Sequence, residues 1–181
     1  ALLPAPVEGI NLEDKQQTTR LLLACGATIG EINAVRKHLS AVKGGLLCVK
    51  AQPARVVSLM MSNVVGDALD TIASGPTYPD TTHFADCLDI VDRYNIRSDL
   101  PAPVRSRLEE GARGGIPDTP KSNNTVFDHV LNKVIGNNAL AVDAAARCAT
   151  ELGYETIVLT SLLEGEAREV GVALALSLIH I

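Results

Sequence analysis

The chain has 181 residues, a length that suits about one domain. Its 16 Lys and Arg residues and 21 Asp and Glu residues give a formal net charge of −5, and 46% of its residues are hydrophobic. This composition is globular rather than disordered. An acidic chain with 3% aromatic residues lacks the charge and stacking surfaces of a general nucleic-acid binder. We therefore expect a cytoplasmic protein with no nucleic-acid partner and no membrane partner.

Two capped helices are predicted at the start of the chain. Asn11 is a suitable N-cap for a helix over about residues 12–24. Thr28 and Glu31 stand three residues apart and fit a capping box, in which each side chain satisfies a free amide of the other residue. The helix that begins there is predicted to run to about Val42, before a pair of glycines.

The second helix carries a cationic stripe. Arg36, Ser40 and Lys43 follow each other at steps of four and three, apart from the apolar stripe of Ile32, Val35, Leu39 and Val42. One interpretation is an exposed basic face, as is usual for charges on a helix. The other is that Arg36 and Lys43 converge on an anion beside the loop that follows.

An apolar run at Val56–Met61 predicts a strand buried on both faces. In open α/β sheets ligands bind at the carboxyl ends of strands, and Asp67 and Asp70 follow this strand. Ser74, Gly75 and Thr77 come next and could supply amides and hydroxyls for phosphate oxygens, with the carboxylates binding Mg²⁺. The alternative is a plain Asx or proline turn.

The remaining elements alternate between helices and strands. We predict helices over about residues 82–94 (with Thr82 as the cap), 104–110, 138–152 and 164–174, and strands over 130–135 and 156–160. A proline- and glycine-rich connection is expected over residues 100–124. Strands and helices joined by short loops indicate an α/β fold. We expect an incomplete, Rossmann-like, three-layer arrangement with a mostly parallel sheet and helices on both faces.

Common motifs of other enzyme classes are absent. The sequence contains no G-x-G-x-x-G fingerprint, no P-loop and no H-E-x-x-H zinc motif. The cations, carboxylates and glycine-hydroxyl turns that remain suit phosphoryl transfer, which depends on cations around the migrating phosphate. By themselves these features indicate only an anion-binding α/β enzyme.

Five motifs, in their order and spacing, resemble those of the glycerate 2-kinases of the MOFRL type. They are Ala1–Ile10, Gly26–Asn33, Val35–Ser40 with Lys43–Gly45, Ser62–Asp67 and Ile72–Thr77. The resemblance continues through Ile135–Asn138 and residues 159–170. It implies ATP-dependent phosphorylation of D-glycerate on its 2-hydroxyl to give 2-phosphoglycerate, with ATP and Mg²⁺ as cofactors and glycerate as the small-molecule substrate.

The resemblance also implies a domain organisation. Residues 1–175 correspond to part of the N-terminal α/β domain, and the C-terminal domain of the family is expected to be absent from this chain. We expect residues 176–181 to be a non-native tail, because they abandon the alanine-rich helical pattern without a cap or stop signal. The chain alone should therefore be inactive or nearly so.

The site hypothesis combines the residue patterns with the resemblance. Arg36, Lys43 and Asp67 are the expected catalytic residues, and Asp67 and Asp70 the expected metal ligands. Substrate and ATP binding is assigned to Lys37, Ser74, Gly75, Thr77 and Asn137. The family usually has Asp where this chain has Asn63, which would remove one carboxylate from a metal site.

Two other functions stay open at this point. A hydroxypyruvate reductase is one, although the missing dinucleotide fingerprint counts against it. A noncatalytic fragment or pseudoenzyme is the other, and it is motivated by Asn63 and by the way in which the chain begins and ends.

Overall fold

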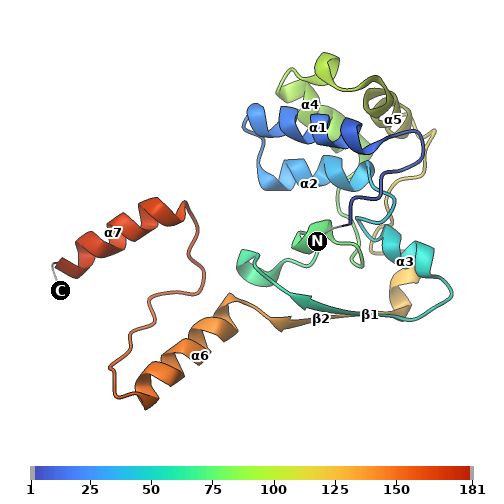
Figure 1. The fold of residues 1–181 in the computed structure, drawn as a ribbon. Helices are drawn as coiled ribbons and strands as arrows, with labels where there is room; N and C mark the ends of the chain where they lie inside the picture. Colours follow the sequence, from blue (N-terminus) through green and yellow to red (C-terminus); the bar gives the residue numbers. More distant parts are fainter. Residues whose placement is uncertain (1–2, 180–181) are drawn as a thin grey trace.

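The computed structural model describes residues 3–179. In chain order the main elements are α1 (Leu12–Ala24), α2 (Ile29–His38), α3 (Leu46–Ala51), β1 (Val56–Met61), α4 (Phe84–Arg93), α5 (Ala102–Ala112), β2 (Val130–Gly136), α6 (Asn138–Glu151) and α7 (Ala167–Ile179). Short 3₁₀ helices lie between them: η1 (Val65–Asp67), η2 (Ile72–Ser74), η3 (Arg97–Asp99) and η4 (Thr125–His129). Figure 1 follows these elements along the chain.

Both predicted helix starts in the first third are confirmed. The Asn11 side chain accepts a hydrogen bond from the Asp14 amide at 2.8 Å, and the Asp14 carboxylate accepts one from the Asn11 amide at 2.9 Å. Thr28 and Glu31 form the equivalent box at the start of α2. Local sequence therefore fixes where α1 and α2 begin, since each box satisfies amides that the first helical turn leaves free.

The end of α2 differs from the prediction. The helix ends at His38 rather than Val42, because the Ser40 hydroxyl accepts hydrogen bonds from the amides of Val42 and Lys43 and holds the chain in a turn. Ser40 also forms an isolated antiparallel bridge with Pro6. Arg36 and Lys43 are therefore not on one helical stripe.

The start of α4 is also shifted. Its N-cap is His83 rather than Thr82, since the amide and hydroxyl of Thr82 both donate to Asp80 Oδ1, at 3.0 and 2.8 Å. The predicted helix near residues 104–110 is confirmed within the longer α5.

The core lies among α1, α2, α4 and α5, which pack together as one helical group (Figure 1). Its most buried members include Leu22, Val35, Val91, Val104 and Leu108. Close packing of these aliphatic side chains removes apolar area from water, which stabilises this part of the molecule.

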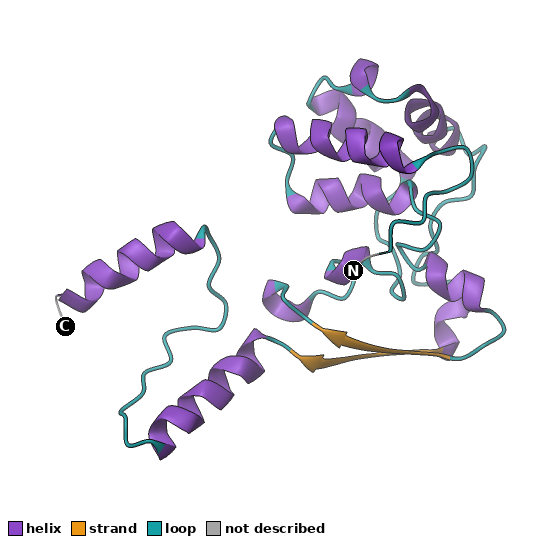
Figure 2. Ribbon diagram, in the orientation of Figure 1, coloured by secondary structure: helices purple, strands orange, loops and turns teal. Residues whose placement is uncertain are grey.

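The strands β1 and β2 pair in parallel, with Val56 opposite Val130 (Figure 2). The α/β fold with a parallel sheet and helices is therefore confirmed. The expectation that β1 is buried on both faces is wrong, since its residues alternate between half-buried and exposed. Val57 is 63% exposed and Met61 is 81% exposed, because only one face of this two-stranded sheet is covered within the described residues.

The last part of the chain leaves the helical group and extends away from it (Figure 1). Helix α6 is confirmed, but residues 156–160 form no strand, because no described strand lies beside them to complete a ladder. Helix α7 begins at Ala167 and continues to Ile179. The helix thus extends beyond its predicted end at residue 174, and residues 180–181 lie outside the described part. Within residues 3–179, no helix is long and apolar enough to cross a membrane.

Candidate functional site

A pocket of about 500 Å³ lies between the N-terminal segment, α1 and the turn that follows α2. One side is apolar and consists of Leu3, Pro4 and Leu12. The polar side carries four cationic residues: Lys15, Arg20, Arg36 and Lys43. We call this space the cationic pocket. Although α2 ends early, the turn after it brings Lys43 to the same pocket as Arg36.

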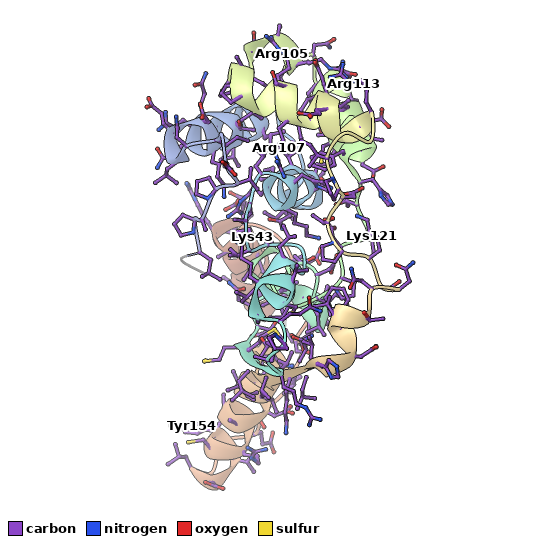
Figure 3. All side chains as sticks on the ribbon, turned by 90° about the vertical axis from the view of Figure 1, so that its right-hand side faces the viewer. Lys43, Arg105, Arg107, Arg113, Lys121 and Tyr154 are labelled. Atoms are coloured by element: carbon purple, nitrogen blue, oxygen red, sulfur yellow. The ribbon has the colours of Figure 1, made fainter. Side chains whose placement is uncertain are left out.

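Lys43 is buried, with 3% of its surface exposed, and its Nζ donates to the Ala73 carbonyl oxygen at 2.7 Å. Figure 3 shows Lys43 at mid-height in the molecule, between the helical group above and α3 below. Burial, and then the positive charges of Arg36 and Lys15, lower the pKa of Lys43 from 10.5 to about 8. An exposed basic face is therefore the wrong interpretation of this cationic pair.

The cations of this pocket have no acidic partner within residues 3–179. Among the residues that the structure describes, no ion pair within 4.0 Å joins Lys15, Arg36 or Lys43 to an Asp or Glu side chain. Arg36 Nη1 donates instead to Asn33 Oδ1 at 3.4 Å, and Lys15 Nζ donates to the Pro4 carbonyl oxygen at 3.1 Å. Converging cations without a carboxylate favour the binding of an anion.

The carbonyl group that contacts Lys43 belongs to a strained segment. Ala73, Ser74 and Gly75 all adopt left-handed backbone conformations, with φ values of 55°, 63° and 56°. This conformation costs about 1–2 kcal/mol for a residue with a side chain. The segment is held by the glycine loop, because the amides of Gly44 and Gly45 donate to the carbonyl oxygens of Ser74 and Gly75 at 3.0 and 2.8 Å. Such strain is concentrated at functional sites.

Ser74, Gly75 and Thr77 make internal contacts and do not line the cationic pocket. Ser74 Oγ donates to Asn33 Oδ1 at 3.0 Å, and the backbone amides of Ser74 and Gly75 are used within their own turn. Thr77 Oγ1 donates to Asn132 Oδ1 at 2.6 Å, and Asn132 Nδ2 donates to the Thr77 carbonyl oxygen at 2.9 Å. In this structure these residues connect α2, the strained segment and β2.

Lys37 points away from the cationic pocket into a buried ion pair. Its Nζ lies 3.1 Å from Asp80 Oδ1 and 3.9 Å from Asp70 Oδ2. Although burial alone would raise the pKa of Asp80, hydrogen bonds from Thr82 and the charge of Lys37 hold it below its usual value. In the last turn of α2, Arg36 therefore lines the cationic pocket, whereas Lys37 lies in the interior.

A second pocket, of about 790 Å³, lies at the carboxyl ends of β1 and β2 beside the start of α6. Asn63, Asp67 and Asn137 all line this strand-end pocket, and Asn137 Nδ2 donates to Asp67 Oδ2 at 2.5 Å. Gly66 and Asp67 have φ values of 77° and 55°, which turn the chain sharply at this point. The strand-end pocket and the cationic pocket share no lining residue.

The structure does not bring Asp67 and Asp70 to one metal site. Asp67 lines the strand-end pocket, whereas the Asp70 carboxylate lies near Lys37. Within residues 3–179, no group of three or more His, Cys, Asp or Glu residues could hold a metal ion. Mg²⁺ is often bound by one or two carboxylates together with substrate phosphates. Asp67, which lines the strand-end pocket together with Asn63 and accepts a hydrogen bond from Asn137, fits that lighter requirement.

Three residues of the site were missed by the sequence analysis: Lys15, Arg20 and Asn33. Lys15 and Arg20 belong to α1, and only the packing of α1 against α2 brings them near Arg36 (Figure 1). Asn33 is buried and accepts hydrogen bonds from both Arg36 and Ser74. The sequence signal for Asn33 was its position three residues before Arg36 on the same helix. An amide side chain that becomes buried there needs polar partners.

Proteins with similar sequences are named glycerate kinases, as the five sequence motifs led us to expect. The chain is 46% identical over 168 residues to glycerate kinase of Macaca fascicularis, covering 93% of this chain and 41% of that protein. It is 45% identical over 171 residues to glycerate 2-kinase of Pyrococcus horikoshii, covering 94% of this chain and 38% of that protein. The chain thus spans well under half the length of these relatives.

Solved structures agree with the sequence comparison. The crystal structure of glycerate kinase from Thermotoga maritima matches with a TM-score of 0.76 and 40% identity, over 94% of this chain and 38% of that one. A Pyrococcus horikoshii crystal structure matches with a TM-score of 0.75 and 44% identity, over 93% and 38% of the two chains. The family described as "Domain of unknown function (DUF4147)" matches residues 1–109. The chain therefore belongs to the DUF4147 family, as its resemblance to the MOFRL-type glycerate kinases leads one to expect.

Proposed function

We propose that the protein carrying this chain is a glycerate 2-kinase, which transfers a phosphoryl group from ATP to the 2-hydroxyl of D-glycerate and forms 2-phosphoglycerate. The observation that carries the proposal is the cationic pocket, in which Lys15, Arg36 and Lys43 face one space, with no acidic partner among the residues that the structure describes. The names of the similar proteins support the choice of glycerate.

The cationic pocket suits the charge changes of phosphoryl transfer. The transferred group and the acid substrate are both anionic, and fixed cations in a partly buried site stabilise the charge that spreads over the equatorial oxygens. Lys43 is the central residue in this proposal, because it is the most buried cation of the pocket. Its Nζ is held by the Ala73 carbonyl oxygen, which belongs to the strained segment. Arg36 is oriented by Asn33 and contributes the second charge.

The strand-end pocket is the proposed nucleotide site. It is the larger of the two pockets, and it lies where ligands bind in open parallel sheets. Asp67, with Asn63 in the same pocket, would hold Mg²⁺, whose chemistry is to neutralise phosphate charge. The chain between Asp67 and the Ala73 carbonyl group connects the two pockets, and the strained segment keeps Lys43 in place.

The proposal assigns supporting roles to the other residues of the site hypothesis. Ser74, Gly75 and Thr77 brace the glycine loop and β2, and Lys37 stabilises the end of α2. Asn137 orients the Asp67 carboxylate. We also propose that residues outside this chain complete the active site, since the chain spans 31–41% of the similar proteins. The 181-residue chain alone is then inactive.

The test is a coupled assay of the complete protein with D-glycerate and MgATP. We expect glycerate-dependent release of ADP, and we expect Lys43→Ala to lower turnover by about a hundredfold, as when one donor of transition-state charge is removed. Lys50→Ala is the matched control, because Lys50 is exposed on α3 and lines neither pocket. Unchanged turnover in Lys43→Ala would remove Lys43 from the mechanism. NADH oxidation with hydroxypyruvate, and no ADP release, would identify a reductase instead.

A further inference from the structure

We propose that Lys15 of α1 is a specificity-determining residue, and that it holds the carboxylate of the acid substrate in the cationic pocket together with Arg36 and Lys43. This inference rests on the proposed function and extends it. It assigns the cationic pocket to the acid rather than to the nucleotide, and it gives α1 a part in substrate binding.

The position of Lys15 follows from how α1 packs. Lys15, Thr18 and Leu22 follow each other at steps of three and four, so they lie on one face of the helix. Thr18 and Leu22 are buried, with 1% and 0% of their surfaces exposed. This fixes the rotation of α1 and turns Lys15 toward the space beside α2. The Asn11 capping box fixes the start of the helix as well.

Lys15 uses one of its hydrogen-bond donors among the described residues. Its Nζ donates to the Pro4 carbonyl oxygen at 3.1 Å, and an ammonium group has three N–H donors. Burial, and then the nearby charge of Arg36, lower the pKa of Lys15. Lys15 in turn contributes to the lowered pKa of Lys43. The three charges therefore repel each other around one small space, and an anion placed there relieves that repulsion.

The shape and chemistry of the pocket favour a small carboxylate over a nucleotide. Its apolar side of Leu3, Pro4 and Leu12 suits a short carbon chain, and no Asp or Glu lines it. Its volume of about 500 Å³ compares with about 790 Å³ at the strand-end pocket, where polar groups follow parallel strands. A neutral polyol carries no negative charge that could offset the three positive charges of the pocket. The substrate class is thus a short hydroxylated carboxylic acid.

The experiment measures binding separately from turnover in the complete protein. Isothermal titration calorimetry gives the dissociation constants of D-glycerate and of MgATP. The proteins compared are the unchanged protein and the variants Lys15→Met, Lys15→Arg and Lys50→Met. We expect Lys15→Met to weaken glycerate binding about tenfold or more, as when a charged hydrogen-bond partner is lost, with MgATP binding unchanged within about twofold. Lys15→Arg keeps the charge and should bind glycerate within about threefold of the unchanged protein. Lys50→Met is the control for loss of a lysine elsewhere.

Steady-state kinetics provides the second measurement. We expect Lys15→Met to raise the KM for glycerate with little change in kcat, because a carboxylate contact is made equally before and during the transfer. Glycerate binding equal to that of the unchanged protein would overturn the inference. Equal weakening of glycerate and MgATP would overturn it too, since Lys15 would then serve the phosphates. Failure of the proposed function is visible separately, as absence of glycerate binding and turnover in the unchanged protein.

Discussion

The body of the molecule, which contains the helical group, and its C-terminal region, from α6 to α7, differ in how far their apolar side chains are buried. Within the described residues, every buried side chain lies between Ile10 and Val126, and α6 has none. Leu140, Leu152 and Ile157 in the C-terminal region are 54%, 71% and 84% exposed. The body contains the helical core and the cationic pocket, whereas the C-terminal region extends away from both (Figure 1).

The comparison shows that a hydrophobic pattern predicts a buried face only where another element packs against it. Helix α1 has few apolar residues, yet Leu22 is fully buried because α2 and α5 lie beside it. Helix α6 is rich in alanine and well capped by Asn137, yet none of its residues is buried, and Leu140 is 54% exposed. Secondary structure depends mainly on local sequence, while stabilisation by burial depends on contacts between elements.

The largest effect is expected at the buried ion pair of the body. Asp80→Asn should lower the free energy of unfolding by about 3–5 kcal/mol, because it leaves Lys37 as a buried charge without its close partner. Chemical denaturation measures the change. Asp92→Asn breaks the exposed pair with Arg97 and should cost less than about 1 kcal/mol. If Asp80→Asn lowered the free energy of unfolding no more than Asp92→Asn, the prediction would fail, because Lys37 would then reach water or another acidic partner.

A core leucine and an exposed leucine test the contrast between the two regions directly. Leu22→Ala should lower the free energy of unfolding by about 2–5 kcal/mol through lost burial and a residual cavity. Leu140→Ala on α6 should change it by less than about 0.5 kcal/mol, since this side chain is half exposed. Urea denaturation of both variants gives the comparison. A loss at Leu140 as large as that at Leu22 would break the contrast, because α6 would then be packed.

A smaller effect than at Asp80 or Leu22 is expected at Asp118, which holds a connecting loop against α2 and α4. Its carboxylate lies 2.9 Å from His38 Nε2 and 2.8 Å from His83 Nδ1. Although burial would raise the pKa of Asp118, hydrogen bonds from His83 and His38 lower it to about 2. A lowered carboxyl pKa stabilises the fold above about pH 4, and this contribution is lost as the pH falls through 2.

We therefore expect Asp118→Asn to destabilise the protein by about 1–2 kcal/mol at neutral pH, with the difference shrinking toward pH 2. Thermal unfolding from pH 7 to pH 2 measures the difference from the unchanged protein. Asp89→Asn is the control, since Asp89 is exposed on α4. A difference that does not depend on pH would mean that Asp118 acts by packing alone.

The sequence predicted the parts of the site better than their arrangement. Arg36 and Lys43 were expected to converge because they share a helical stripe, but α2 ends at His38 and the Ser40 turn brings Lys43 to the pocket. Asp67 lines the strand-end pocket, whereas Asp70, expected at the same metal site, lies beside Lys37. Lys15 could not have been chosen from the sequence, because its role depends on the packing of α1 against α2.

The sequence by itself determined the local features of this protein: the capping boxes at Asn11 and Thr28 and the positions of most of the helices. These follow from hydrogen bonds and backbone preferences within a few residues. Only the tertiary structure decided which lysines are buried, which hydroxyls are used internally and which carboxylate lines a pocket. Those outcomes depend on desolvation and on partners distant in the chain, and residues 156–160 show the same dependence, since a strand requires a neighbour.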